Sequence, residues 1–457
     1  MLLSTYTKMP NQESSYHIGD GPDTDALEAD PPTKPLSIIK NFQLGWFAMV
    51  MGWGGTALAL NILPGVSDDI HTVLNIIGTV IWVWDLIYCI IFSSLLLARI
   101  VLYPKPYWEM MKGPAQFLFF GCMPMGVAVV GMGFVPFGPN IMSEKVAYEI
   151  AYVLFYLDVA LSVIAMVLPP FMMVVYQKHT PENMQSLWLL PFVSCVVAAA
   201  QAGVVGPVME DLSRQQDILF TGFILWGAGI LTAAPIIAIY MSRLVFYGFP
   251  PNGLGNSVWV ILGPIGQGCN AIVMLGRNAG QLQCTGHFCP DKTTIMDTCA
   301  CSGALTPLGA FGYVLPGITL MTGCVMWGIG VWWLFMASTG SIYHASIVDK
   351  AIKKVHNPIS RNQSFLTPDN KGRLSETTIN QPQRRPRALP FNLGWWGVVF
   401  PFVTLIMGTG QLYIDTGFGW FMWCGRIFTV CLVIISFYVH IKTISKAVTR
   451  QFWVNFG

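Results

Sequence analysis

Apolar stretches without a single Asp, Glu, Lys or Arg alternate with short charged segments along most of the chain. A membrane-spanning helix needs about 20 mainly apolar residues, and a charge at its centre costs roughly 2.5–3.5 kcal/mol. Six stretches are free of charge and three more hold one charge each: 41–67, 113–143, 183–209, 218–242, 244–276 and 388–414, then 70–98, 150–177 and 416–441. Each of them predicts one transmembrane helix.

A tenth uncharged stretch, 298–348, is longer than the others. It has room for two helices, but its first half is interrupted by Gly303, Pro307, Gly309, Gly312, Pro316 and Gly317. Glycine and proline are poor residues for a helix interior, so we expect a single helix here. The sequence therefore predicts an all-α polytopic membrane protein with ten transmembrane helices.

The placement of lysine and arginine predicts the orientation independently, because cytoplasmic loops retain positive charge. With the N-terminus inside, the cytoplasmic loops hold Arg99, Lys105, Lys112, Lys178, Arg243 and nine more between Lys350 and Arg387. The loops on the other side hold only Lys145, Arg214, Arg277 and Lys292, which is 14 against 4. An even number of helices then leaves both termini in the cytoplasm. We expect a multi-pass protein of the cell membrane, with the lipid bilayer as its solvent.

Polar segments flank and interrupt the helical region. Residues 1–37 are polar, lean acidic and lack the apolar core of a signal peptide, which predicts a disordered cytoplasmic tail. The transmembrane domain spans 38–448, and a short cytoplasmic tail follows at 449–457. Within the domain, the segment 340–390 is basic and rich in Pro, Asn and Ser, which predicts a flexible cytoplasmic loop.

Composition excludes several classes of protein. Of the 457 residues, 54% are hydrophobic and only 11% are charged, whereas a soluble domain is about one quarter charged. The net charge of +2 provides no basic surface of the kind that binds nucleic acid. The sequence contains no His-Glu-x-x-His zinc motif, no Gly-x-Ser-x-Gly nucleophile elbow and no phosphate-binding loop. We therefore expect neither an enzyme nor an ATP-driven pump, and no cofactor.

Four cysteines gather after the seventh predicted helix: Cys284, Cys289, Cys299 and Cys301. Their spacing does not repeat the paired C-x-x-C pattern of a zinc site, although His287 lies among them. The predicted topology places this loop outside the cell, where disulfides persist. We expect structural disulfides here, with a metal site as the weaker alternative and the pairing left open.

Three charged residues lie within predicted helices, namely Asp85, Asp158 and Arg426 on the second, fourth and tenth. An ionisable residue inside a membrane is a functional-site hypothesis by default. One interpretation gives Asp85 or Asp158 a role in proton coupling. The other makes both structural, bracing the helices through ion pairs with Arg426. No second basic residue extends such a path, which favours the structural interpretation.

Proline and glycine mark the odd-numbered predicted helices. The third, fifth, seventh and ninth contain Pro124, Pro191, Pro264 and Pro401, and the first contains Gly52, Gly54 and Gly55. Proline removes a backbone hydrogen bond and kinks a helix, which membranes tolerate where the broken backbone lines a cavity. Even-numbered helices contain proline too, so the pattern alone is a weak signal. It predicts five kinked helices around a narrow path, with five straighter helices outside.

Two segments resemble one known family. Residues 42–52, FQLGWFAMVMG, are similar to the first helix of the tellurite-resistance/dicarboxylate transporter family, and residues 391–401, FNLGWWGVVFP, are similar to its ninth. This family includes fungal malic acid permeases, fungal sulfite efflux pumps and plant slow anion channels. The resemblance covers 38–448 and implies five helical hairpins around a central pore, commonly assembled as a homotrimer.

The resemblance also implies roles for single residues. A phenylalanine on the ninth helix plugs the pore in this family, and Phe400 matches it; without the resemblance, Phe400 is an ordinary packing residue beside a proline. The residues then expected to line the pore are Gly52, Trp53, Gly54, Pro124, Pro191, Pro264, Gln267 and Pro401. Trp53 stands where the family usually has Thr, and its ring would narrow the path.

The branch of the family is indicated by residues 263–267, Gly-Pro-Ile-Gly-Gln, which resemble the sulfite efflux pumps. The Arg-Pro-Gly and Gly-Pro-Pro strings of malic acid permeases are absent. We therefore expect a transporter or channel that exports small anions, with sulfite ahead of malate or another C4-dicarboxylate. The alternative from a different class is a membrane sensor or scaffold whose 340–390 segment recruits partners.

Overall fold

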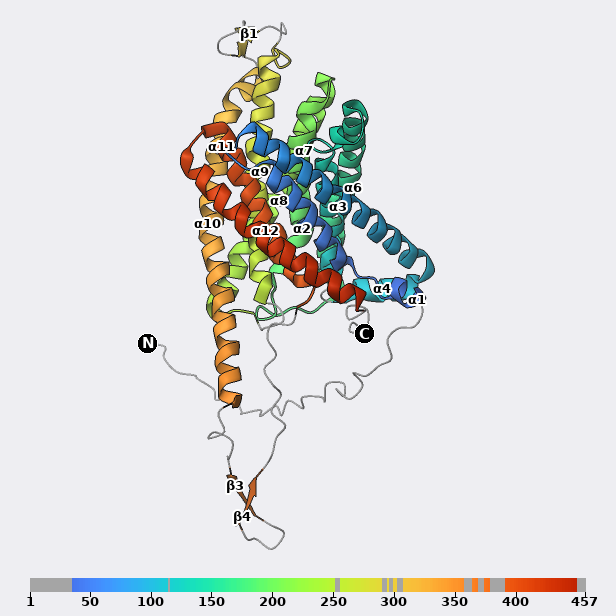
Figure 1. Cartoon of the computed structure of the whole chain (residues 1–457), viewed down its shortest axis with the longest axis vertical. Coiled ribbons are helices and arrows are strands. Elements are labelled where there is room, and N and C mark those ends of the chain that lie inside the picture. The colour runs from blue at the N-terminus through green and yellow to red at the C-terminus, as the bar shows by residue number, and fades with distance from the viewer. Residues whose placement is uncertain are drawn as a thin grey trace, which may run out of the picture.

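The computed structural model describes residues 35–113, 116–250, 255–289, 294–295, 299–301, 307–356, 364–368, 374–378 and 391–449. These residues form an elongated, almost entirely helical bundle (Figure 1). The predicted tails lie almost wholly outside the described residues. Two short helices, α1 (Pro35–Lys40) and α4 (Pro104–Lys112), lie at one end of the bundle.

Ten longer helices follow one another as five antiparallel hairpins. The pairs are α2 (Phe47–Asn61) with α3 (Asp68–Leu102), α5 (Cys122–Gly133) with α6 (Glu144–Tyr176), α7 (Leu190–Val205) with α8 (Leu212–Tyr247), α9 (Leu262–Cys284) with α10 (Pro307–His356), and α11 (Trp396–Thr416) with α12 (Gly419–Val448). Nine spans in the described part of the chain are long and apolar enough to cross a membrane, and α2 completes the ten. The prediction of an all-α, ten-helix membrane protein is confirmed.

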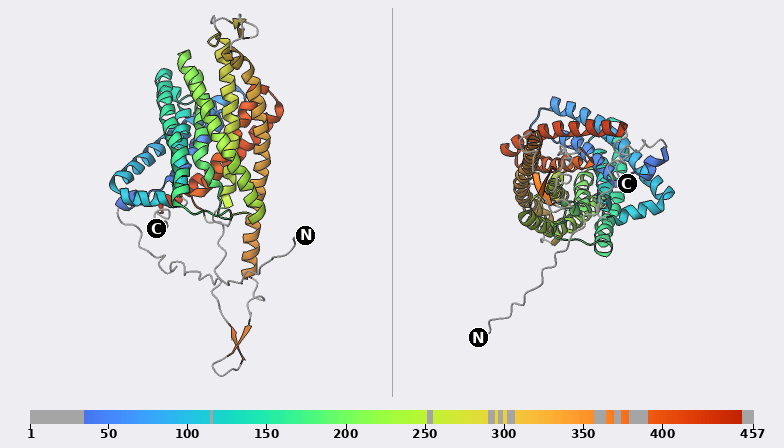
Figure 2. Two further views of the ribbon diagram at one scale, coloured as in Figure 1. Left: turned by 180° about the vertical axis from the view of Figure 1, so that it is seen from behind. Right: turned by 90° about the horizontal axis from the view of Figure 1, so that it is seen from below.

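Burial separates the hairpins into inner and outer helices. In the spans that contain α5, α7, α9 and α11, 78–100% of the most apolar window is buried, against 17–33% for α3, α6, α8, α10 and α12. Every α2 residue from Phe47 to Leu60 is also buried. The outer helices expose large apolar side chains such as Phe246 and Val174, as expected of helices that face lipid. Figure 2 shows the paired helices arranged around the long axis of the bundle.

Each inner helix begins with a tight 3₁₀ turn that leads directly into the α-helix. The turns are η2 (Leu44–Trp46), η3 (Gln116–Gly121), η5 (Ser186–Leu189), η7 (Gly255–Ile261) and η9 (Leu393–Trp395). Three of the prolines predicted to kink helices instead lie at this junction, since Pro124, Pro191 and Pro264 all fall in the first α-helical turn. A missing N–H is tolerated there, because first-turn amides have no partner within the α-helix. Pro401 alone lies deeper, in the second turn of α11.

Glycine permits the closest approaches between inner helices. A Cβ atom on Gly266 of α9 would lie 2.5 Å from the backbone nitrogen of Leu405 in α11. A Cβ atom on Gly52 of α2 would lie 2.5 Å from the Trp396 ring of α11. Because real Cβ atoms do not approach this closely, any side chain at either position would push the inner helices apart.

The tenth uncharged stretch contains a single helix, as predicted, but that helix begins earlier than expected. The glycine- and proline-containing segment expected to be a poor helix is helical from Pro307 onward, and α10 runs through Pro316 to His356. A proline inside a helix is tolerated in membranes because neighbouring groups satisfy the freed carbonyl. The predicted loop at 340–390 thus begins as helix. It also contains the antiparallel strands β3 (Ser364–Pro368) and β4 (Leu374–Thr378), with Ser364 paired to Thr378.

The four clustered cysteines form two pairs at the far end of the bundle. Cys284 is bonded to Cys299 and Cys289 to Cys301. They enclose a two-stranded ribbon of β1 (Thr294–Ile295) and β2 (Ala300–Cys301). Figure 1 shows β1 at the end opposite to α1, α4, β3 and β4. The disulfides therefore tie the connection between α9 and α10, on the side that the predicted topology places outside the cell.

Candidate functional site

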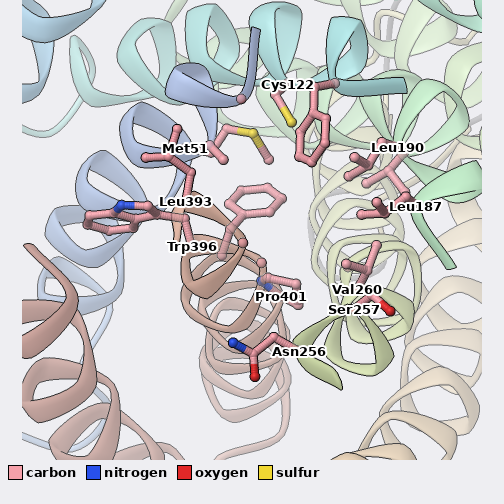
Figure 3. Close-up of a pocket in the computed structure, with 18 of the residues that line it drawn as sticks. Met51, Cys122, Leu187, Leu190, Asn256, Ser257, Val260, Leu393, Trp396 and Pro401 are labelled. Carbon is pink, nitrogen blue, oxygen red and sulfur yellow. The ribbon is translucent and has the colours of Figure 1, made fainter. Parts of the chain in front are cut away.

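A cavity of about 380 Å³ opens where the first turns of all five inner helices meet (Figure 3). Its apolar lining includes Met51, Cys122, Leu190, Val260 and Trp396, one residue from each inner segment. None of the residues that line it is charged. Helix N-termini carry partial positive charge and unpaired N–H groups. Five of them converging on a neutral cavity create a weak but favourable environment for an anion.

Phe400 and Pro401 of α11 line this cavity. Phe400 is only 5% exposed. One turn further along, the Thr404 hydroxyl donates to the Pro401 carbonyl at 2.7 Å and lies 3.1 Å from the Leu262 carbonyl of α9. These contacts occupy the Pro401 carbonyl and hold α11 against α9 beside Phe400. The position of Phe400 at the lining of a cavity agrees with that of a gate, although its gating role stays a prediction.

The other residues expected to line the pore do not line this cavity, namely Gly52, Trp53, Gly54, Pro124, Pro191, Pro264 and Gln267. Gly54 faces α3, where an added Cβ atom would meet the Asp85 carboxylate. The Trp53 ring turns toward α12 and stacks on His440, with ring centroids 3.8 Å apart. A pore-lining role for these seven residues stays a prediction.

The expected bracing of the two aspartates by Arg426 is wrong. Arg426 donates to the carbonyl oxygens of Pro64 and Gly65, in the connection between α2 and α3. Asp85 is fully buried at the α2–α3 contact, against Gly54. Asp158 is fully buried in α6 and accepts a hydrogen bond from Ser162 at 3.2 Å. Sequence reasoning correctly placed each charge within its helix but could not show which helix face carried it.

The opposite ends of the inner helices carry charge. Arg277 was assigned to an extracellular loop, but it lies within α9 and forms an ion pair with Asp415 of α11 at 2.6 Å. A second hollow, of about 560 Å³, is lined by both residues and by Cys284 and Pro316. Since Asp415 neutralises Arg277, this end of the inner bundle also presents little net charge.

Sequence reasoning missed five carboxamide residues that line the cavity: Gln43, Gln116, Gln185, Asn256 and Asn392. They share a signal that the sequence does contain. Each amide is followed three residues later by an aromatic residue: Trp46, Phe119, Trp188, Trp259 and Trp395. This Gln/Asn-x-x-Trp/Phe repeat occurs once at the start of every inner helix.

A sequence model of the voltage-dependent anion channel family, SLAC1, matches residues 41–444. The match includes all ten long helices through most of α12. The chain belongs to this family. The resemblance read from residues 42–52 and 391–401 is thereby confirmed, and the neutral cavity is a feature of an anion transporter.

Three curated proteins with sequences similar to this chain are named as transporters. The sulfite efflux pump SSU1 of Arthroderma benhamiae is 26% identical over 414 residues, which is 90% of this chain and 92% of that protein. SSU1 of Saccharomyces cerevisiae is 22% identical, over 83% of this chain and 81% of that protein. The malic acid transport protein of Schizosaccharomyces pombe is 23% identical, over 54% and 56%.

In this family member, the cavity at the start of the inner helices is lined by backbone and neutral side chains. Within the described residues, no group of three or more His, Cys, Asp or Glu side chains is placed to hold a metal ion. A fixed Lys or Arg would bind an anion tightly and slow its release, whereas conduction needs weak binding at several sites. The geometry of the cavity fits passage of an anion better than its retention.

Proposed function

We propose that this protein exports small acid anions and that sulfite is its substrate. The observation that carries the proposal is the neutral cavity at five helix N-termini, with Phe400 in its lining. Relatives named sulfite efflux pumps align over nearly the whole chain, whereas the malic acid transport protein aligns over about half of it. Malate or another C4-dicarboxylate is the second candidate substrate.

Export of an anion needs no further energy source. An anion that leaves a cell with a negative interior gains about 2.3 kcal/mol per charge per 100 mV. A pathway that only conducts can use this gradient directly. Uptake against the same potential would require coupling, for which Asp85 and Asp158 are the mid-helix candidates.

The proposal includes a location and an assembly. The excess of basic residues in the predicted cytoplasmic loops supports a topology with both termini in the cytoplasm, and we place the protein in the plasma membrane. In that orientation the cavity lies at the cytoplasmic mouth, where an exported anion arrives. We also propose a homotrimer, as the family resemblance implies, and transport in place of catalysis.

Purified protein in liposomes distinguishes the candidates. We expect labelled sulfite to leave loaded vesicles at least about tenfold faster than from protein-free vesicles, a difference of about 1.4 kcal/mol in the barrier. Malate loaded at the same concentration should leave more slowly than sulfite. A larger malate flux would make this chain a dicarboxylate transporter, and equal leakage of both with and without protein would favour a sensor or scaffold.

The buried aspartates give a second prediction, on pH dependence. We expect Asp85→Asn and Asp158→Asn to retain the pH profile of sulfite flux, because neither side chain lines the cavity. Asparagine has nearly the same shape as aspartate, so the packing against Gly54 and Ser162 would persist. Flux between pH 5 and 8 measures this. Loss of the pH profile in either variant would show that export is coupled to protons through that residue.

A further inference from the structure

The five carboxamides occupy equivalent positions in a repeated structural unit. In three copies, the backbone N–H of the aromatic residue donates to the carbonyl of the amide residue three positions earlier, at 3.2 Å: Trp46 to Gln43, Trp188 to Gln185 and Trp395 to Asn392. The other two copies lie within the longer turns η3 and η7. In every copy the amide residue thus lies at or next to the start of the 3₁₀ turn, four to six residues before its α-helix.

These side chains gather at one cavity. All five line it and all are half-buried. Two neighbours touch, since the Gln116 Nε2 group donates to the Gln43 Oε1 atom at 3.3 Å. The Asn392 Oδ1 atom accepts a hydrogen bond from the backbone N–H of Gly394 at 2.9 Å. This bond does not use the two N–H groups of the Asn392 side chain, which can still donate.

A buried hydroxyl adjoins the carboxamides. Ser257 lines the same cavity beside Asn256, as Figure 3 shows. It is 92% buried, since only 8% of its surface is exposed, and its Oγ atom has no hydrogen-bond partner. A buried, unpartnered hydroxyl costs free energy unless a ligand or water satisfies it. The cavity therefore contains a hydroxyl group that can hydrogen-bond to a ligand.

We propose that Gln43, Gln116, Gln185, Asn256 and Asn392 form a carboxamide ring that recognises oxyanions before they reach Phe400. Carboxamides donate two hydrogen bonds each yet carry no charge, so they replace water around an anion without trapping it. An oxyanion has acceptor oxygens spread over its surface and can therefore span several ring members at once, whereas a halide requires its donors to converge on a single atom. Phe400 lies in the second turn of α11, whereas Asn392 precedes the 3₁₀ turn that leads into this helix, so Phe400 lies deeper along the helix than the ring. This inference rests on the proposed transport of anions and assigns its selectivity.

Acidic variants test the ring. Gln43→Glu, Gln185→Glu and Asn256→Asp each put a negative charge on the path with little change in size, and like charges repel strongly at short range. We expect each to lower sulfite flux in proteoliposomes about tenfold or more. The neutral variant Gln185→Met removes donors without adding charge, and should lower the ratio of sulfite to chloride flux about fivefold.

The matched control is Gln177→Glu. Gln177 is a half-buried amide that donates to the Gly113 carbonyl at 3.2 Å and does not line the cavity. We expect its flux to equal that of the unmodified protein. For each variant, elution as a single species from size-exclusion chromatography and an unchanged melting temperature establish folding. If one acidic variant fails to fold, the other two still test the ring.

The outcomes separate this inference from the proposed function. If the unmodified protein passes sulfite and the acidic variants pass it equally well, the ring does not lie on the path. If Gln177→Glu slows flux as much as they do, the effect is one of general charge and the ring is again rejected. If the unmodified protein passes no anion, the proposed function itself fails.

Discussion

Replacing Phe400 with alanine should increase anion flux roughly tenfold or more, which corresponds to about 1.4 kcal/mol or more of removed barrier. Phe400 is buried in the lining of a cavity whose other side chains are all neutral. Alanine keeps the α-helix but removes the phenyl group that narrows the path. Sulfite flux from proteoliposomes, or current in a planar bilayer, measures the change.

The control for this variant is Phe402→Ala. Phe402 is as buried as Phe400 and lies two residues away on the same helix, but its ring faces Trp259 and Phe428 and does not line the cavity. We expect this variant to lose stability without gaining flux. Equal flux in the Phe400→Ala and unmodified proteins would return Phe400 to a packing role.

Adding one methyl group at Gly266 should destabilise the protein more than most single substitutions. The new Cβ atom would lie 2.5 Å from the Leu405 nitrogen and 2.6 Å from the Thr404 Oγ1 atom. Because the Leu405 nitrogen belongs to the backbone, it cannot move aside as the end of a flexible side chain can. The added methyl group therefore forces α9 and α11 apart. Overpacking of this kind typically costs about 1–3 kcal/mol, and we expect Gly266→Ala to lower the melting temperature in detergent and the yield of folded protein.

Gly227→Ala provides the opposite expectation. Gly227 lies in the outer helix α8, and an added Cβ atom there meets nothing within 4 Å. Alanine favours the helix over glycine by about 0.5–1 kcal/mol, so this variant should be as stable as the original or slightly more. If the Gly266→Ala protein has the same melting temperature as the Gly227→Ala protein, the α9–α11 contact tolerates expansion.

The arrangement of helices could be predicted because a charge inside the bilayer is costly and therefore rare. Gaps between charged residues predicted ten spans, and the structure places the proline- and glycine-marked set inside. Helix ends were less predictable, as α10 shows. Its Pro316 lies within a continuous helix, where the sequence suggested an interruption. Composition alone does not reveal which prolines neighbouring helices will accommodate.

The site was predicted only in part. Phe400 and Pro401 were placed through a family resemblance, and both line the cavity. The five carboxamides were not predicted, because Gln and Asn are neither charged nor helix-breaking. Asp85 was identified as an unusual residue, but its proximity to Gly54 depends on how α2 and α3 pack. Such contacts arise from tertiary geometry, which one sequence does not display.

The measurement that tests the central claim most directly is sulfite efflux from proteoliposomes at imposed membrane potentials, without a pH gradient or nucleotide. A conducting pathway for anions predicts that efflux accelerates as the vesicle interior becomes more negative, since each charge gains about 2.3 kcal/mol per 100 mV. Phe400→Ala should show the same dependence at a higher rate. An efflux rate that does not change with the membrane potential, or efflux that occurs only with a proton gradient, would contradict a conducting anion pathway.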